Sequence, residues 1–303
     1  MSIDAVADEL LSQYLDPEAK EMQHIGSYEL PADVFVEGVI EKCRAVLFPG
    51  YAGADVARVD LPQLREMVRE RVEELSAELH EQVYRALHHK RQQALGKTGE
   101  KTDLECADCT ANAKVIVARF LARLPELRSQ IKLDLRAAYE ADPAATGIDE
   151  ILLTYPGTYA ITTYRIAHAL FREGSVIVPR MMTEIAHRRT GIDIHPGADI
   201  GKSFFVDHGT GVVIGETTLI GDRVRIYQGV TLGALTVPQG EARPEPGKRR
   251  HPTLEDDVVI YANATILGGD TVIGRSAVIG GNAFITASVA AGSKVSGQGR
   301  TQR

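Results

Sequence analysis

The chain has 303 residues, enough for two compact domains, and 44% of them are hydrophobic, as in a soluble globular protein. Its formal net charge of -7 argues against nucleic acid as a general partner. The first residues are acidic where a signal peptide needs basic ones, and no apolar run is long enough to cross a bilayer. We therefore expect a cytoplasmic protein that binds neither nucleic acid nor membrane.

Helical spacing dominates the first part of the chain. Apolar residues recur three and four apart over residues 32–47, and again after Asp60, which forms a candidate capping box with Gln63. A further helical stripe over 117–141 contains Pro125, which either kinks that helix or starts a new one.

The helical spacing continues to the end of the first two thirds of the chain. Asp142-Pro143 ends the stripe, because the residue before a proline is pushed out of helical geometry. Further helices follow over 148–190. The period then changes abruptly at Gly191, so we expect residues 1–190 to form an α-helical domain.

The three cysteines, Cys43, Cys106 and Cys109, are too few for a disulfide framework. Cys106 and Cys109 have the spacing of half a zinc site, but no second cysteine or histidine pair lies close by in sequence. We expect two reduced cysteines at the start of a helix, with a metal or redox role as the less favoured alternative.

Large apolar residues recur with a period of six from Ile192 to Val295. Six is a multiple of the strand period of two and out of step with the helix period of 3.6, so these residues share one face only in an extended chain. Three such hexads would close one triangular coil around the apolar anchors. The anchors are Ile194, Ile200, Val206, Val212, Ile214, Ile220, Ile226, Leu232, Leu254, Ile260, Ile266, Val272, Val278 and Phe284.

The predicted fold is therefore α+β and multidomain, with the helices followed by a parallel β-helix over 191–295. Residues 233–250 contain several prolines and glycines and no anchors, which predicts one loop extruded between coils. Residues 296–303 have no apolar content beyond the last coil and are expected to form a flexible tail.

Asp193 and His208 are candidate catalytic residues, because a little less than one coil of three hexads separates them along the chain. That spacing would bring them to neighbouring coils near one edge, where a carboxylate could orient an imidazole as a general base. The alternative is that Asp193 caps a turn and His208 is an ordinary surface residue, and spacing alone does not separate the two.

Eight segments resemble the serine O-acetyltransferases of the hexapeptide-repeat acyltransferase superfamily, and the likeness covers roughly residues 112–295. The segments are Asp142–Ala144 (DPA), Tyr164–His168 (YRIAH), Gly191–Pro196 (GIDIHP), Asp207–Gly211 (DHGTG), Val213–Thr217 (VIGET), Val230–Gly233 (VTLG), Arg250–Pro252 (RHP) and Ala264–Gly268 (ATILG). The resemblance implies a left-handed β-helix that transfers acetyl from acetyl-CoA to the hydroxyl of L-serine, the first step of cysteine biosynthesis, without a metal.

The resemblance also implies which residues act on serine. His208 would take the hydroxyl proton, and Asp193 would orient its ring. Two acidic residues would hold the serine ammonium and two basic ones its carboxylate: Asp142 and Asp207, and Arg250 and His251. These residue types suit a zwitterion, which needs carboxylates at one end and a guanidinium at the other.

By the same resemblance, acetyl-CoA would lie between coils of adjacent subunits. Its pantetheine amides would meet backbone beside Gly233, Ala234 and Ala262, where small residues permit close approach. Lys248 and Arg249 would meet its phosphates; the alternative is that they are solvated loop charges.

The resemblance implies a homotrimer, with the N-terminal helices suited to joining two trimers. The chain ends in Thr301-Gln302-Arg303, not in the terminal isoleucine by which many relatives insert into cysteine synthase. Association with that enzyme is therefore not expected.

Three other functions are compatible with the same repeats. A related O-acetyltransferase could use a different acceptor. A carbonic anhydrase of the same architecture would need three metal-binding histidines, for which His195, His208 and His251 are available, although no close histidine pair recurs on successive coils. An inactive β-helix scaffold would require nothing of Asp193 or His208.

Overall fold

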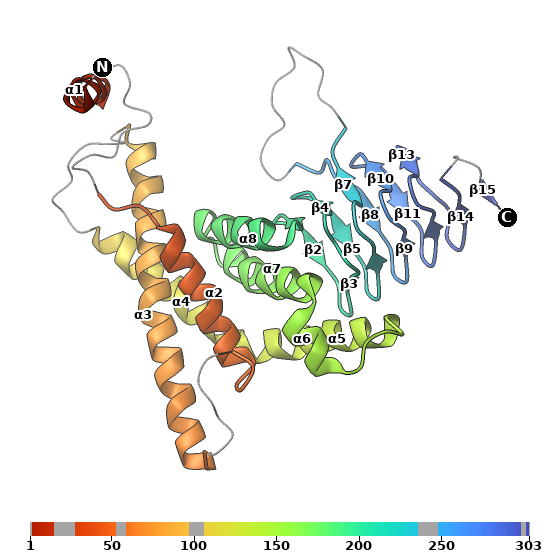
Figure 1. Ribbon diagram of the computed structural model, residues 1–303, viewed down its shortest axis with the longest axis horizontal. Coiled ribbons are helices and arrows are strands. Elements are labelled where there is room, and N and C mark those ends of the chain that lie inside the picture. The colour runs from red at the N-terminus through yellow and green to blue at the C-terminus, as the bar shows by residue number, and fades with distance from the viewer. Residues whose placement is uncertain are drawn as a thin grey trace.

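The computed structural model describes residues 2–14, 28–52, 59–96, 106–235 and 248–297, together with the backbone of 301–302. The described helices lie between Ile3 and Thr190, and short strands follow from Asp193 onward (Figure 1). The expected loop between coils falls largely on residues 236–247, which lie outside the described residues. No described helix combines the length and the apolar character needed to cross a bilayer.

The sequence predicted most of the helices and two of their ends. The capping box is confirmed, because the Gln63 backbone N–H donates to Asp60 Oδ1 at 2.8 Å and the Asp60 N–H donates to Gln63 Oε1 at 3.0 Å. Pro125 starts a new helix, and Asp142 ends it. The described helices are α1 (Ile3–Tyr14), α2 (Asp33–Leu47), α3 (Leu61–Ala94), α4 (Ala107–Ala122), α5 (Leu124–Ala141), α6 (Ile148–Thr154), α7 (Pro156–Arg172) and α8 (Ile177–Thr190).

The expectation of reduced cysteines at a helix start is wrong in one respect. Cys106 and Cys109 do lie at the start of α4, but they form a disulfide. Their Cα atoms are 5.1 Å apart, a separation that a disulfide spans without backbone movement. Cys43 is a free, buried thiol.

The strands form a parallel β-helix with three faces, as the repeats predicted, and it is of the left-handed type that the family resemblance implied. The first face contains β1 (Asp193–Ile194), β4 (Val213–Ile214), β7 (Thr231–Gly233), β10 (Thr265–Leu267) and β13 (Phe284–Ile285). The second contains β2 (Asp199–Ile200), β5 (Leu219–Ile220), β8 (Thr253–Leu254) and β11 (Val272–Ile273). The third contains β3 (Phe205–Val206), β6 (Arg225–Ile226), β9 (Val259–Ile260), β12 (Val278–Ile279), β14 (Lys294–Val295) and β15 (Thr301–Gln302), which runs antiparallel to β14.

The predicted anchors are buried from Ile194 to Ile266, but the last three are in the wrong phase. Ile273, Ile279 and Ile285 fill the interior there, and Phe284 is 70% exposed. The step from the buried Ile266 to the buried Ile273 is one position longer than a hexad, and neighbouring strand residues point to opposite faces. The sequence did not predict this shift, because both residues of Val272-Ile273 and of Val278-Ile279 are aliphatic and either could face inward.

Helix α7 closes the open end of the β-helix, which explains the YRIAH segment. The first coil has no earlier strand to satisfy its carbonyl groups, so side chains of α7 must do so. The Tyr164 hydroxyl donates to Ala198 O at 2.6 Å, and His168 Nδ1 lies 2.8 Å from Pro196 O. The Arg165 guanidinium donates to the carbonyls of Ile200 and Gly201, at 2.5 Å each.

Arg165 is itself neutralised by a buried acid. Its guanidinium forms two parallel hydrogen bonds with Asp134 of α5, at 3.0 and 3.1 Å, and both side chains are almost fully buried. Asp134 also accepts the backbone N–H of Phe204, at 2.9 Å. This pair therefore joins α5, α7 and the first coil of the β-helix at one point.

Candidate active site

The predicted site residues lie on the two edges that border the first face. At one edge the chain turns from the third face to the first, and we call the group Asp142, Asp207 and His208 found there the acidic edge. At the other it turns from the first face to the second, and we call Lys248, Arg249, Arg250 and His251 the basic edge. In a single chain the width of the first face separates the two groups.

On the acidic edge, Asp142 is held in place by a residue that the sequence analysis missed. Tyr155, between α6 and α7, donates its hydroxyl to Asp142 Oδ2 at 2.6 Å, and the Ala144 N–H donates to the other oxygen at 2.9 Å. The Tyr155 bond is the largest cause of a lowered pKa at Asp142, and the charge of His208 lowers it further. The same bond raises the pKa of Tyr155 to about 12, so its hydroxyl stays a donor.

His208 projects from a lengthened turn. Asp193 pairs with Val213 on the next coil, and Val213 pairs in turn with Thr231. The second of these steps has the three hexads that the repeats predicted, whereas the first is two positions longer, and the extra positions lie in the turn that contains His208. The backbone of His208 is left-handed, with φ of 56°, and its side chain is 74% exposed. Its Nε2 lies 3.8 Å from Asp207 Oδ1.

On the basic edge, Thr217 fixes the orientation of His251. The Thr217 backbone N–H donates to His251 Nδ1 at 3.1 Å, so the neutral ring carries its proton on Nε2. The ring lies against Gly215, where a Cβ atom would come within 2.1 Å of it, so only glycine fits. Burial lowers the pKa of His251 to about 4, and the charge of Arg250 adds to this effect. His251 is therefore a neutral hydrogen-bond donor at pH 7.

Arg250 is oriented by Glu216, the residue before Thr217. Its guanidinium forms an ion pair with the Glu216 carboxylate, and its backbone N–H donates to Thr217 Oγ1 at 2.9 Å. Two consecutive residues of one coil thus orient two consecutive residues of the next. The sequence offered one signal for Glu216 and Thr217, their place in the family-like segment 213–217.

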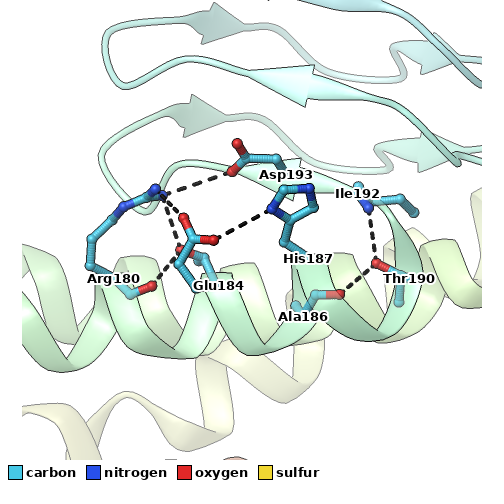
Figure 2. A network of polar contacts seen from close by, with 8 residues as sticks. Arg180, Glu184, Ala186, His187, Thr190, Ile192 and Asp193 are labelled. Atoms are coloured by element: carbon cyan, nitrogen blue, oxygen red, sulfur yellow. Dashed lines mark hydrogen bonds and ion pairs between the residues drawn. The ribbon is translucent and has the colours of Figure 1, made fainter. Parts of the chain in front are cut away.

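Asp193 starts the first face, and its carboxylate lies toward Arg180 of α8 (Figure 2). Arg180 Nη1 lies 3.8 Å from Asp193 Oδ1, and the same guanidinium is ion-paired with Glu184. No hydrogen bond or ion pair joins Asp193 to His208, two residues that the structure describes. Their pairing stays a prediction.

Glu184, His187 and Asp193 bring three possible metal ligands within 4.8 Å of one another. Figure 2 shows Arg180 reaching into the same group, so a positive charge of the chain already balances these two carboxylates. This arrangement suits an ion-pair network better than a cation site.

The residues predicted for acetyl-CoA divide between the same two edges. Gly233 ends β7 and Ala234 follows it, on the side of the basic edge, whereas Ala262 lies in a turn in line with the acidic edge. Lys248 and Arg249 are exposed, and Arg249 donates to Thr253 Oγ1 at 2.5 Å. Tyr261, beside Ala262, stacks on the ring of Tyr227, 5.1 Å away between centroids.

The low pKa of His251 predicts a measurable effect on stability. Above pH 6.5 the ring is neutral in both the folded and the unfolded chain, so it has no effect. Between pH 6.5 and about 4 the unfolded chain binds a proton at His251 and the folded chain does not, so the free energy of unfolding decreases as the pH is lowered. We expect the melting temperature of the wild type to fall more steeply over this range than that of His251→Gln. Parallel melting curves would contradict the assignment.

Comparison with known proteins agrees with this architecture. No family model matches the chain. The chain is 43% identical over 295 residues to a plasmid-encoded serine acetyltransferase of Synechococcus elongatus, covering 97% of this chain and 90% of the relative. It is 44% identical over 168 residues to a serine acetyltransferase of Helicobacter pylori, covering 54% of this chain and 94% of that protein.

Solved structures extend the likeness to the fold of nearly the whole chain. Serine acetyltransferase 1 of Entamoeba histolytica, in complex with L-cysteine, superposes with a TM-score of 0.71 at 34% identity, covering 96% of both chains. A Neisseria gonorrhoeae serine acetyltransferase in complex with serine gives a TM-score of 0.53 at 26% identity, covering 90% of this chain and 96% of that one. The relatives and the solved structures match this chain over almost its full length, and they agree with its capped β-helix and its two edges of motif residues. The chain therefore belongs to the serine acetyltransferases, a family of acyltransferases.

Proposed function

We propose that the enzyme transfers acetyl from acetyl-CoA to the hydroxyl of L-serine, at a site that joins an acidic edge to a basic edge. The supporting observation is that the acidic residues lie at one edge of the first face and the basic residues at the other. Asp142 and Asp207 lie beside His208 on one edge, and Arg250 lies beside the neutral donor His251 on the other. These groups match the ammonium, the hydroxyl and the carboxylate of serine. Relatives crystallised with serine and with cysteine support an amino-acid ligand.

One serine molecule is too small to bridge both edges of a single chain. If three copies turn their first faces toward a common axis, the acidic edge of each copy meets the basic edge of the next. Val213 and Phe284 support this packing, because they are apolar, point outward from the first face and are 38% and 70% exposed. The functional unit is then a homotrimer with three sites, each shared by two chains.

In this site His208 acts as the general base. It takes the proton from the serine hydroxyl as that oxygen attacks the acetyl carbonyl of the thioester. The new C–O bond forms, the C–S bond breaks, and His208 returns the proton to the departing sulfur. Asp193 orients the imidazole once its carboxylate has turned from Arg180. His251 Nε2–H and the Arg250 guanidinium hold the substrate carboxylate.

Acetyl-CoA would lie along the boundary between two copies. Small residues on both sides of that boundary, Gly233 and Ala234 on one and Ala262 on the other, leave the backbone open to its pantetheine amides. Lys248 and Arg249 are exposed on the basic edge and would meet its phosphates. A cytoplasmic location is part of this proposal.

The helical region would join two such trimers. Helix α1 buries none of its residues against the described chain, and Leu61 at the start of α3 is largely exposed. These apolar surfaces suit contact with a second trimer. The mass of the native assembly separates a trimer from a dimer of trimers.

The shared site is tested by mixing two inactive variants. His208→Ala lacks the base on the acidic edge, and Arg250→Ala lacks the guanidinium on the basic edge. In co-expressed, randomly mixed trimers, about one neighbour pair in four combines two intact halves, so activity should return to roughly a quarter of the wild-type value. The assay follows acetyl-CoA consumption with L-serine, and with homoserine as a competing acceptor.

The matched control mixes two variants of the same edge, His208→Ala and Asp142→Ala. No pair of these chains contains an intact acidic edge, so no activity should return. Recovery in this control, or its absence in the His208→Ala and Arg250→Ala mixture, would show that the site is not divided between chains in this way.

Thr217 should affect the binding of serine more than the chemical step. Its hydroxyl accepts the backbone N–H groups of Arg250 and His251, at 2.9 and 3.2 Å. Thr217→Val leaves both donors unpaired, so we expect KM for serine to rise about tenfold with kcat nearly unchanged, because one such loss costs about 1–3 kcal/mol. The control is Thr218→Val, whose buried hydroxyl has no hydrogen-bond partner and should change neither constant. Equal effects would refute the positioning role.

A further inference from the structure

The disulfide at the start of α4 lies in surroundings that the acetyl transfer does not use. Cys106 is the N-cap residue of the helix, and the Cys109 N–H donates to Cys106 Sγ at 3.1 Å. Arg91 of α3 brings its Nη1 to 3.0 Å from the same sulfur and 3.1 Å from Asp108 Oδ2. Helix α4 contacts α3, α5 and α7 but no strand of the described chain.

Three features of this site favour a thiolate at Cys106 once the disulfide is open, whereas the Asp108 carboxylate, which shares Arg91, opposes it. The guanidinium, the Cys109 N–H and the positive end of the helix dipole all stabilise negative charge on Sγ. Cys43 offers the opposite case, because it is fully buried in α2 and burial raises the pKa of its thiol. The chain thus contains one cysteine suited to exchange chemistry and one that is not.

We propose that Cys106 and Cys109 form a thiol–disulfide exchange site whose reaction partner is a dithiol. A thiolate of the dithiol attacks Cys109 Sγ, the bond between the two cysteines breaks, and Cys106 leaves as the stabilised thiolate. The second thiol of the partner then attacks the mixed disulfide and releases Cys109, which takes up a proton. Two electrons pass to the protein, and the partner becomes a disulfide.

The position of the pair allows this reaction. Cys106 and Cys109 are 9% and 5% exposed, and Ala107 and Asp108 between them are exposed, so the bond lies just beneath the surface at the end of a helix. Disulfides in reducing compartments are usually transient, which suits a reversible pair better than a permanent crosslink.

The first experiment traps free thiols in the full-length native protein and identifies them by peptide mass spectrometry. Untreated protein should show no alkylation at Cys106 or Cys109. After dithiothreitol both should be alkylated while Cys43 is not, and a monothiol such as glutathione at the same thiol concentration should open far less. Free thiols at both positions before reduction, or a disulfide that resists dithiothreitol, would overturn the proposal.

The second experiment tests the part played by Arg91 in the reduced protein. Arg91→Gln should slow the alkylation of Cys106 by iodoacetamide at pH 7 about tenfold, as expected when the thiol pKa rises by roughly one unit. Arg91→Lys should restore most of the rate. Arg69→Gln is the control, because Arg69 is on the same helix but pairs with Glu66 and Glu73. Equal rates for Arg91→Gln and Arg69→Gln would refute the thiolate argument, whatever the acetyltransferase activity.

Discussion

Replacing His208 by alanine should lower kcat/KM for the acetylation of serine by about 10²–10⁴-fold, the usual contribution of a general base. The imidazole is the strongest base of the acidic edge, because carboxylates such as those of Asp142 and Asp207 are weaker bases than imidazole. KM for serine should change little, since the ammonium and the carboxylate of the substrate are bound by other residues. Steady-state kinetics with L-serine and acetyl-CoA measure both constants.

The backbone at His208 calls for a second variant. Alanine is strained at a φ of 56°, so a loss of activity in His208→Ala has two possible causes. Asparagine tolerates the left-handed conformation, retains hydrogen-bonding capacity and cannot act as a base. His208→Asn should therefore keep the wild-type melting temperature and lose as much activity as His208→Ala. A variant that retains activity within a few fold would remove His208 from the base role.

Replacing Asp134 by alanine should destabilise the protein by about 3–5 kcal/mol, because it leaves the Arg165 guanidinium buried without its counter-charge. The helix α7 that carries Arg165 also supplies Tyr164 and His168 to the carbonyls of the first coil. Loss of Asp134 should thus loosen the attachment of the helices to the β-helix. Urea denaturation at one fixed protein concentration measures the effect.

Two further variants separate charge burial from lost packing. Asp134→Leu combined with Arg165→Met removes both charges and keeps the volume but also removes the donor to the carbonyls of Ile200 and Gly201, so it should recover part of the stability lost in Asp134→Ala. Glu66→Gln breaks an exposed ion pair with Arg69 and should leave the unfolding midpoint unchanged. If the double variant were as unstable as Asp134→Ala, the two side chains would matter for their hydrogen bonds to the backbone and not for their charges.

The interior of the β-helix followed from the sequence almost completely, because a repeat of six places each anchor by its own position in the chain. The exception was the last part, where Val272 was predicted to face inward and Ile273 does. One extra residue reverses the two sides of a strand, and where both candidates are aliphatic only packing decides between them. The Asp60 cap was also predicted, because a capping box depends only on residues that are close together in the sequence.

The residues of the active site show the same difference between what the sequence predicts and what packing decides. Sequence by itself determined the chemical types, with His208 among acids and Arg250 beside a histidine, because motifs are local and resemblance transfers them residue by residue. Only the tertiary structure decided that Tyr155 holds Asp142, that Thr217 sets the proton of His251, and that Asp193 faces Arg180. These contacts join residues that folding brings together from different coils and helices, and the spacing of those residues along the chain does not predict the contacts.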